Sequence, residues 1–104
     1  SLISISSGEM REMVRKARRI QRERYKGTDY ENNGGLDESG LERFCETDKK
    51  GRSLMAEAHD RMGLTMRAYG KLLKVARTIA DLEEADIIRE EYVAEALMYR
   101  TSGF

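Results

Sequence analysis

The amino-acid sequence predicts an all-α fold, a small bundle of about five helices. The chain has 104 residues and contains no Pro, and 37% of its residues are charged. Good helix formers (Ala, Leu, Arg, Glu, Lys and Met) are plentiful, and apolar residues recur at helical spacing. Strand-like alternation is confined to residues 2–5. The length suits one domain that buries a real core with modest stability.

The first helix is expected from a capping box, in which Ser6 is followed three residues later by Glu9. It runs to about Tyr25, and Gly27 suits its C-terminal end. Its apolar stripe consists of Met10, Met13, Val14, Ala17, Ile20 and Tyr25. The other face carries Arg11, Arg15, Lys16, Arg18, Arg19, Arg22 and Arg24.

A loop is expected at residues 27–35, where Asn-Asn-Gly-Gly is the strongest turn signal in the chain. This loop is the one candidate boundary in the chain. Residues 1–35 would form a basic helix and linker that can stand apart from the rest, and residues 36–104 would form a helical bundle. Because the chain begins with Ser-Leu rather than Met, we expect it to be a piece of a longer protein, with residues 1–35 linking to the absent part.

The remaining helices are expected at residues 37–45, 48–62, 65–83 and 89–99. Gly63 closes the third helix and Thr65 caps the fourth. Ile87-Ile88 is expected to form a short extended anchor before the fifth. The inward positions are Leu36, Leu41, Phe44, Leu54, Met55, Ala58, Met62, Met66, Tyr69, Leu72, Leu73, Ala76, Ile79, Ala80, Tyr92, Val93, Ala96 and Leu97.

The composition argues against an autonomous enzyme. The single cysteine, Cys45, gives no disulfide framework or metal cluster and is expected to be a small buried hydrophobe. The single histidine, His59, is expected at the surface and has no nucleophile beside it. The chain has no phosphate-binding glycine loop. No apolar run approaches the ~20 residues that span a bilayer, so we expect a cytoplasmic protein without membrane contact.

Charge is unevenly distributed, although the formal net charge is zero. Residues 1–30 hold 8 basic and 4 acidic side chains, residues 31–64 hold 5 and 8, residues 65–80 hold 4 and 0, and residues 81–104 hold 2 and 7. Two interpretations remain open: the helices complement one another within the domain, or a basic helix faces an anion.

Arg67 occupies an unusual position in the first turn of the fourth helix. A cation there is mildly unfavourable, because the helix dipole is positive at this end. At 100° per residue, Arg67, Lys71 and Lys74 form one basic stripe opposite the apolar face. An Arg beside free backbone N–H groups suits a phosphate, and the alternative is an ion pair with a carboxylate of an adjacent acidic helix.

The first helix offers a second candidate surface. Over residues 9–26 it has 8 basic and 3 acidic side chains, which suits nucleic acid, with Arg15, Arg18, Arg19 and Arg22 as candidate contacts. The alternatives are a solvated helix, a helix packed on an absent domain, or a protein–protein adaptor using Met10 and Met13.

Several segments together resemble a known family. In the first helix they are Ser6-Ser7, Met10-Arg11, Val14, Ala17-Arg18, Gln21 and Arg24. Further along they are Asn33, Leu36, Leu41–Cys45, Leu64-Thr65-Met66-Arg67-Ala68-Tyr69, Lys74–Leu82, Glu95-Ala96-Leu97 and Tyr99-Arg100. This pattern, which covers nearly all of residues 6–100, is similar to the C-terminal domain of magnesium-chelatase-like AAA+ ATPases, and most to the ComM or YifB type.

The resemblance implies an α-helical lid that follows an ATPase core. Arg67 matches the sensor 2 arginine, which reaches the ATP γ-phosphate in its own subunit or in a neighbouring protomer of a hexameric ring. ATP and Mg would be bound through the absent core. The resemblance implies no role for Lys71 and Lys74, which are expected to tune the local potential because they belong to the same basic stripe. The ComM branch implies a parent that remodels DNA as a branch-migration helicase; a lid of a true magnesium chelatase subunit and a non-catalytic nucleic-acid-binding module are the alternatives.

Overall fold

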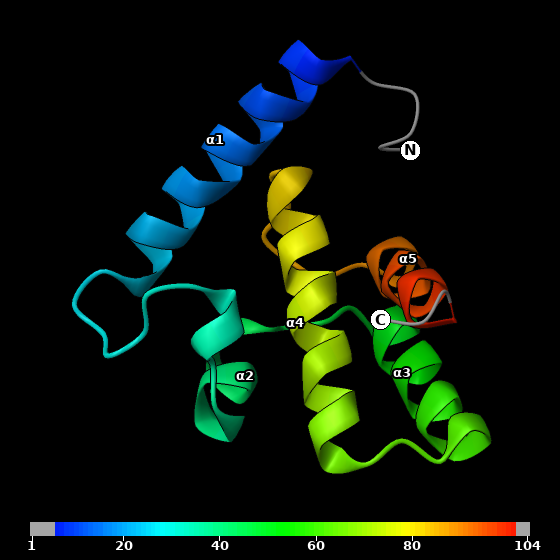
Figure 1. Ribbon diagram of the computed structural model, residues 1–104. Coiled ribbons are helices and arrows are strands. Elements are labelled where there is room, and N and C mark those ends of the chain that lie inside the picture. The colour runs from blue at the N-terminus through cyan, green and yellow to red at the C-terminus, as the bar shows by residue number, and fades with distance from the viewer. Residues whose placement is uncertain (1–5, 102–104) are drawn as a thin grey trace.

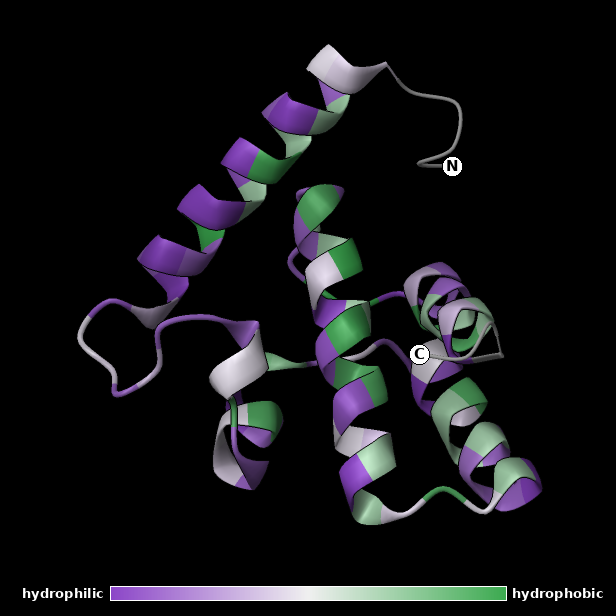
Figure 2. Cartoon of the chain, in the orientation of Figure 1, coloured by the Kyte–Doolittle hydropathy of each residue, from purple (hydrophilic) through white to green (hydrophobic). Residues whose placement is uncertain are grey.

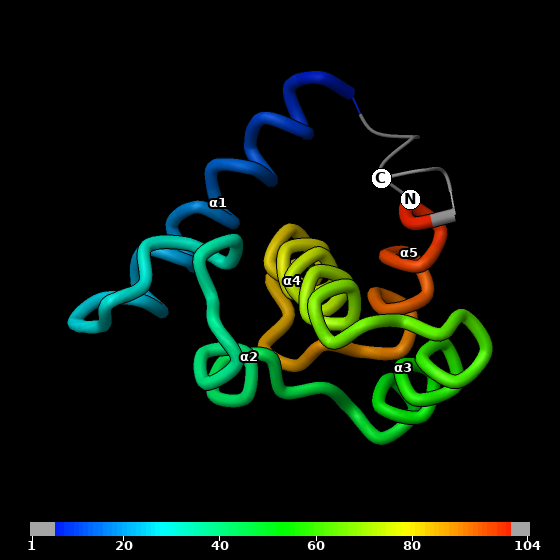
Figure 3. Tube along the Cα trace, turned by 60° about the horizontal axis from the view of Figure 1, so that its bottom comes forward, coloured from blue at the N-terminus to red at the C-terminus, as the bar shows by residue number. Residues whose placement is uncertain are grey.

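The computed structural model describes residues 6–101 and confirms the all-α fold that the sequence predicts. The helices are α1 (Ser7–Tyr25), α2 (Glu38–Phe44), α3 (Lys49–Met62), α4 (Met66–Leu82) and α5 (Glu90–Thr101), with the short 3-10 helix η2 (Asn33–Gly35) after α1. α4 stands at the centre, with α1 and α2 on one side and α3 and α5 on the other (Figure 1). The view turned by 60° shows the same arrangement (Figure 3).

Helix starts are fixed by local side-chain caps. The Ser6 hydroxyl accepts a hydrogen bond from the Glu9 amide at 3.1 Å, and the Thr65 hydroxyl accepts one from the Ala68 amide at 3.0 Å. Asp37 and Asp48 cap α2 and α3 in the same way. Each capping side chain accepts a hydrogen bond from a backbone N–H that has no partner within its helix. The position of the capping residue therefore fixes where the helix begins.

Two glycines follow helix ends with positive φ angles. Gly27 after α1 has φ 76° and Gly63 after α3 has φ 60°. Glycine reaches this left-handed region without the Cβ clash that other residues incur, which confirms both predicted helix ends.

The extended anchor predicted at Ile87-Ile88 is present. The Ile88 amide donates to the Glu46 carbonyl and the Asp48 amide donates to the Ile88 carbonyl, both at 2.9 Å, in an isolated parallel bridge between Thr47 and Ile88. The Ile88 side chain is fully buried. This bridge places the start of α5 against the start of α3.

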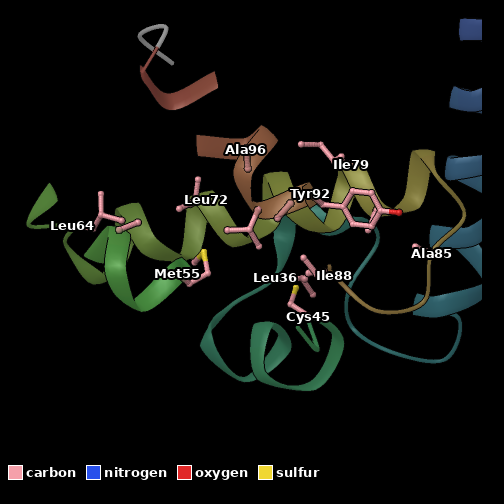
Figure 4. Close-up of a cluster of buried hydrophobic side chains, with 14 of the residues drawn as sticks. Leu36, Cys45, Met55, Leu64, Leu72, Ile79, Ala85, Ile88, Tyr92 and Ala96 are labelled. Carbon is pink, nitrogen blue, oxygen red and sulfur yellow. The ribbon is translucent and has the colours of Figure 1, made fainter. Parts of the chain in front are cut away.

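The core lies mainly between α3, α4 and α5, and Figure 4 shows part of it. α4 supplies Leu72, Ala76, Ile79 and Ala80, and α5 supplies Tyr92, Val93 and Ala96. Cys45 is 5% exposed, and burial raises the pKa of its thiol to about 11. The thiol therefore stays protonated at neutral pH and behaves as the small hydrophobe expected from the sequence.

Two methionines predicted to face inward do not. Met66 is 71% exposed and Met62 is 42% exposed. Met66 lies in the first turn of α4 and Met62 in the last turn of α3. Both residues therefore flank the connection between the two helices, at the edge of the bundle. Along α1 only Ala17 and Tyr25 of the apolar stripe are buried, while Met10, Met13, Val14 and Ile20 are partly exposed.

Gly70 lies inside α4 and is buried. A Cβ at this position would lie 3.2 Å from the Leu41 Cδ1 atom of α2. The missing side chain thus lets α2 pack closely on α4, and this contact offsets the roughly 1 kcal/mol that Gly costs in a helix relative to Ala.

Candidate functional site

A buried polar cluster joins α1 to α4. The sequence alone does not assign a role to the residues that form it. At its centre is Asp81, whose side chain is fully buried. Arg24 of α1 donates to both Asp81 carboxylate oxygens, at 2.9 and 2.5 Å. Arg77, one turn before Asp81 on α4, donates from Nε at 3.1 Å. Two guanidinium groups therefore share one carboxylate.

The remaining donors and acceptors of this cluster are also satisfied. Asn33 of η2 donates from Nδ2 to Asp81 at 2.9 Å and to the Thr78 hydroxyl at 3.1 Å. Its Oδ1 accepts from Arg24 and from the Tyr25 hydroxyl, and the Gln21 side chain accepts from its backbone N–H. Arg77 also donates to the carbonyls of Phe44, Ala85 and Asp86. Among the described residues, no buried side-chain polar atom lacks a partner.

The two arginines respond differently to this environment. Burial lowers the pKa of Arg77, and Asp81 only partly compensates. Burial opposes the charge of Arg24 as well, but the hydrogen bond and charge of Asp81 outweigh it and raise the pKa of Arg24. Both side chains remain cations at neutral pH, so the cluster carries a net positive charge held by hydrogen bonds.

Arg77 does not belong to the surface charge of α4. In the sequence it is one of four cations within residues 65–80, but its side chain is 2% exposed and pairs with Asp81. The sequence does contain a signal of this buried pair. Arg77 and Asp81 have the i,i+4 spacing of a helical ion pair, and they lie among Ala76, Ile79 and Ala80, which are buried. The surface cations of α4 are thus Arg67, Lys71 and Lys74.

Arg67 is exposed in the first turn of α4, directly after the Thr65 cap. Within residues 6–101 its guanidinium makes no ion pair, so the predicted alternative, a pair with an adjacent acidic helix, is wrong for this part of the chain. The cap takes the amide of Ala68, and no hydrogen bond in the same part of the chain takes the amides of Met66 and Arg67. A guanidinium and two backbone donors are together available to an anion at this end.

Lys74 has a structural role that Arg67 lacks. Its Nζ donates to the Gly34 carbonyl of η2 at 3.2 Å. A hydrogen bond from Tyr30 lowers the pKa of Asp37, and the charge of Lys74 contributes to the same shift. Lys71 is exposed on the same face. Of the three cations, Arg67 is best placed to contact a ligand.

A groove of about 1450 Å³ runs along this face, and its lining includes Arg67, Lys71 and Lys74. Asp37, Glu38, Glu42 and Glu46 line it as well, together with Arg43 and Arg52, so its charge is mixed. The acidic residues lie in α2, in its cap and in the segment after it, whereas Arg67 lies in the first turn of α4 beside open backbone amides. The favourable location for an anion is therefore the Arg67 end.

The other candidates from the sequence lie at the surface. His59 is exposed, with Nδ1 3.6 Å from an Asp60 carboxylate oxygen, and its ring meets Tyr69 edge to face. Among residues 6–101 no group of three His, Cys, Asp or Glu side chains is placed to hold a metal ion. The candidate nucleic-acid contacts Arg15, Arg18, Arg19 and Arg22 are all exposed on α1.

The fold and this face together define a class, a small helical-bundle domain built around a central helix whose N-terminus presents an exposed arginine. A sequence profile described as "Magnesium chelatase, subunit ChlI C-terminal" matches residues 4–100. Because the match covers nearly the whole chain, the chain belongs to this family of C-terminal domains.

Three similar proteins each match more than nine tenths of this chain. The chain is 40% identical over 95 residues to "Competence protein ComM" of Haemophilus influenzae, covering 91% of this chain and 18% of that protein. It is 33% identical over 97 residues to "Uncharacterized protein YifB" of Escherichia coli, covering 93% and 19%, and 34% identical over 95 residues to the YifB of Salmonella typhimurium, covering 91% and 19%. The chain thus spans about a fifth of their length. No solved structure matches the chain significantly.

Within the described residues, no helix combines the length and the apolar character needed to span a bilayer.

Proposed function

We propose that this chain is the lid domain of an AAA+ ATPase, and that it supplies Arg67 as the sensor 2 arginine contacting the γ-phosphate of ATP. The observation that carries the proposal is the placement of Arg67, an exposed guanidinium beside open backbone amides at the N-terminus of a 17-residue helix. The helix dipole disfavours a cation at this end in the absence of an anion.

In this proposal the core of the parent protein binds ATP and Mg. Charge accumulates on the γ-phosphate oxygens during phosphoryl transfer, and a fixed guanidinium there lowers the energy of the transition state. Release of phosphate removes the anion that holds Arg67, so the lid becomes free to move relative to the core. Lys71 contributes to the local positive potential, whereas Lys74 mainly holds η2.

We propose further that the parent is a cytoplasmic ring ATPase that remodels DNA, with the lid contacting its own core and a neighbouring protomer. Membership of the chelatase C-terminal family supports the ATPase setting. The choice of DNA over insertion of a metal ion rests on the resemblance to the ComM branch, to one protein of which the chain is 40% identical.

The test is steady-state ATP hydrolysis by the full-length parent carrying Arg67→Ala. We expect turnover to fall at least about ten-fold, with nucleotide affinity changing much less, because the arginine acts mainly on the transition state. The matched control is Arg61→Ala, which removes an exposed guanidinium from the last turn of α3, where its pair with Glu57 at 3.0 Å is solvent-exposed. Unchanged turnover in Arg67→Ala, or an equal loss in the control, contradicts the sensor assignment.

A further inference from the structure

The outward face of α1 carries a continuous row of arginines that the fold does not use. Figure 2 shows the outer side of α1 as hydrophilic along the helix. The row consists of Arg11, Arg15, Arg18, Arg19 and Arg22, followed by Lys26, all exposed. At 100° per residue they fall within about 100° of one another. We call this set the α1 ridge.

The opposite side of α1 is the one that docks on the bundle. Ala17, Arg24 and Tyr25 are buried or partly buried there, and Arg24 is tied to Asp81 of α4. On the helical wheel these positions lie on the far side from the centre of the ridge or at its margin. The buried cluster therefore fixes the rotation of α1 and directs the ridge away from the domain.

The ridge lacks compensating charge within residues 6–101. Arg15 pairs with Glu12 at 2.8 Å, an exposed contact, and the other four arginines of the ridge form no ion pair in this part of the chain. Like charges at i,i+3 and i,i+4 spacing, such as Arg11 with Arg15 and Arg18 with Arg22, disfavour a helix. The ridge thus works against the stability of α1, and a polyanion relieves this repulsion.

The chemistry of the ridge fits the phosphate backbone of duplex DNA. Five of its six cations are arginines, whose guanidinium groups bind phosphate in a bidentate manner. From Arg11 to Arg22 the row extends about 17 Å along a helix axis, enough for several phosphates. The ridge has no aromatic side chain to stack on unpaired bases and no Asn or Gln to read adenine, so the contacts it offers a duplex are mainly those of guanidinium groups with phosphates.

We infer that the α1 ridge binds duplex DNA through its phosphate backbone without sequence preference. This inference rests on the part of the proposed function that assigns the parent to DNA, and it is independent of Arg67. The two experiments fail separately, since ATP turnover tests Arg67 and the experiment below measures DNA binding by α1 without ATP.

The experiment is fluorescence anisotropy of a labelled random-sequence 24-base-pair duplex titrated with the 104-residue chain between about 50 and 200 mM salt, a range over which phosphate contacts are strongly weakened. The variant Arg15→Gln, Arg18→Gln, Arg19→Gln, Arg22→Gln removes four charges and keeps good helix formers. The control Lys49→Gln, Lys50→Gln, Arg61→Gln, Arg89→Gln removes four exposed charges elsewhere. Circular dichroism verifies that both remain folded.

We expect the wild-type affinity to fall steeply with salt. In the ridge variant the slope of log K against log salt becomes about 3.6 less steep, since each lost phosphate contact contributes about 0.9, and affinity at low salt falls at least about ten-fold. The control keeps most of the wild-type slope. Equal loss in both variants overturns the inference, because net charge alone would then explain binding.

Two further probes decide the class of ligand. A single strand of the same length bound more tightly than the duplex overturns the choice of duplex DNA. Poly-glutamate bound as tightly as the duplex, and lost in the ridge variant, also overturns it and assigns the ridge to an acidic protein surface.

Discussion

Replacing Asp81 with Asn removes the only negative charge in the buried cluster while keeping nearly the same shape. The Asp81 carboxylate accepts hydrogen bonds from Arg24, Arg77 and Asn33, which are all donors. In the variant, the amide side chain keeps one acceptor oxygen and turns an NH₂ group toward a neighbour that also donates. Two guanidinium groups are then left close together without a counter-charge.

The structure indicates how large the loss should be. Arg24 is 14% exposed at its side chain and can reach water, whereas Arg77 is 2% exposed and cannot. Removing one partner of a buried ion pair costs about 3–5 kcal/mol. A domain of this size has about 5–15 kcal/mol in total, so Asp81→Asn should consume a large part of it. The melting temperature should fall by at least about 12 °C.

The assay is equilibrium unfolding in urea, followed by circular dichroism at 222 nm. The control is Glu84→Gln, because Glu84 is a nearby carboxylate whose contact with Lys16 is long, 3.8 Å, and exposed. Its loss should cost less than about 1 kcal/mol. If Asp81→Asn also costs less than about 1 kcal/mol with an unchanged m-value, the cluster is not the link that holds α1 on α4, and the reasoning is refuted.

Arg24→Gln combined with Asp81→Asn should cost about 1–3 kcal/mol less than the sum of the single changes, measured by the same urea unfolding, and strict additivity would contradict direct coupling. Gly70→Val should be about 1–3 kcal/mol less stable than Gly70→Ala, because the larger side chain overlaps Leu41, and equal stability would place α2 farther from α4. For Cys45 the folded pKa of about 11 exceeds the ordinary value of 9.0, so the thiol stabilises the fold below pH 9 and this contribution is lost as the pH rises toward 11. Wild type should lose about 1.4 kcal/mol per pH unit more than Cys45→Ala in that window, as measured by urea unfolding at each pH, and parallel curves would refute the assignment.

The helix boundaries could be predicted because their determinants are local. A capping side chain acts on a backbone amide three residues away, as Ser6 does on Glu9 and Thr65 on Ala68. A left-handed residue after a helix is read from a single Gly, as at Gly63. Such signals are visible in the sequence without knowledge of the tertiary contacts.

The buried cluster could not be predicted in the same way, because Arg24 and Asp81 lie 57 positions apart. Which arginine of α1 reaches Asp81 depends on the crossing of α1 and α4 and on the loop that carries Asn33. The division of the chain at residue 35 remains a prediction, and the contacts of Arg24 and Asn33 with Asp81 show that the two parts touch.

The place of Arg67 follows from the sequence more fully than the cluster does. The cap at Thr65 fixes Arg67 in the first turn of its helix, and its exposure follows from the helical wheel. The different roles of Lys74 and Arg67 depended on η2, whose Gly34 carbonyl accepts from Lys74. That contact comes from a loop, where backbone geometry follows from packing rather than from residue spacing.

The residues that carry the family resemblance divide into two groups with different physical roles. The first group meets in the buried cluster, and the docking of α1 on α4 explains its presence. It consists of Gln21, Arg24, Asn33, Arg77, Thr78 and Asp81. Arg67 belongs to the same pattern, yet it is exposed, contributes no ion pair within residues 6–101, and stands where the helix dipole disfavours it. The fold accounts for the first group and not for Arg67. Its place at this helix start is therefore what motivates the proposed phosphate contact, because an anion there would offset the unfavourable dipole interaction.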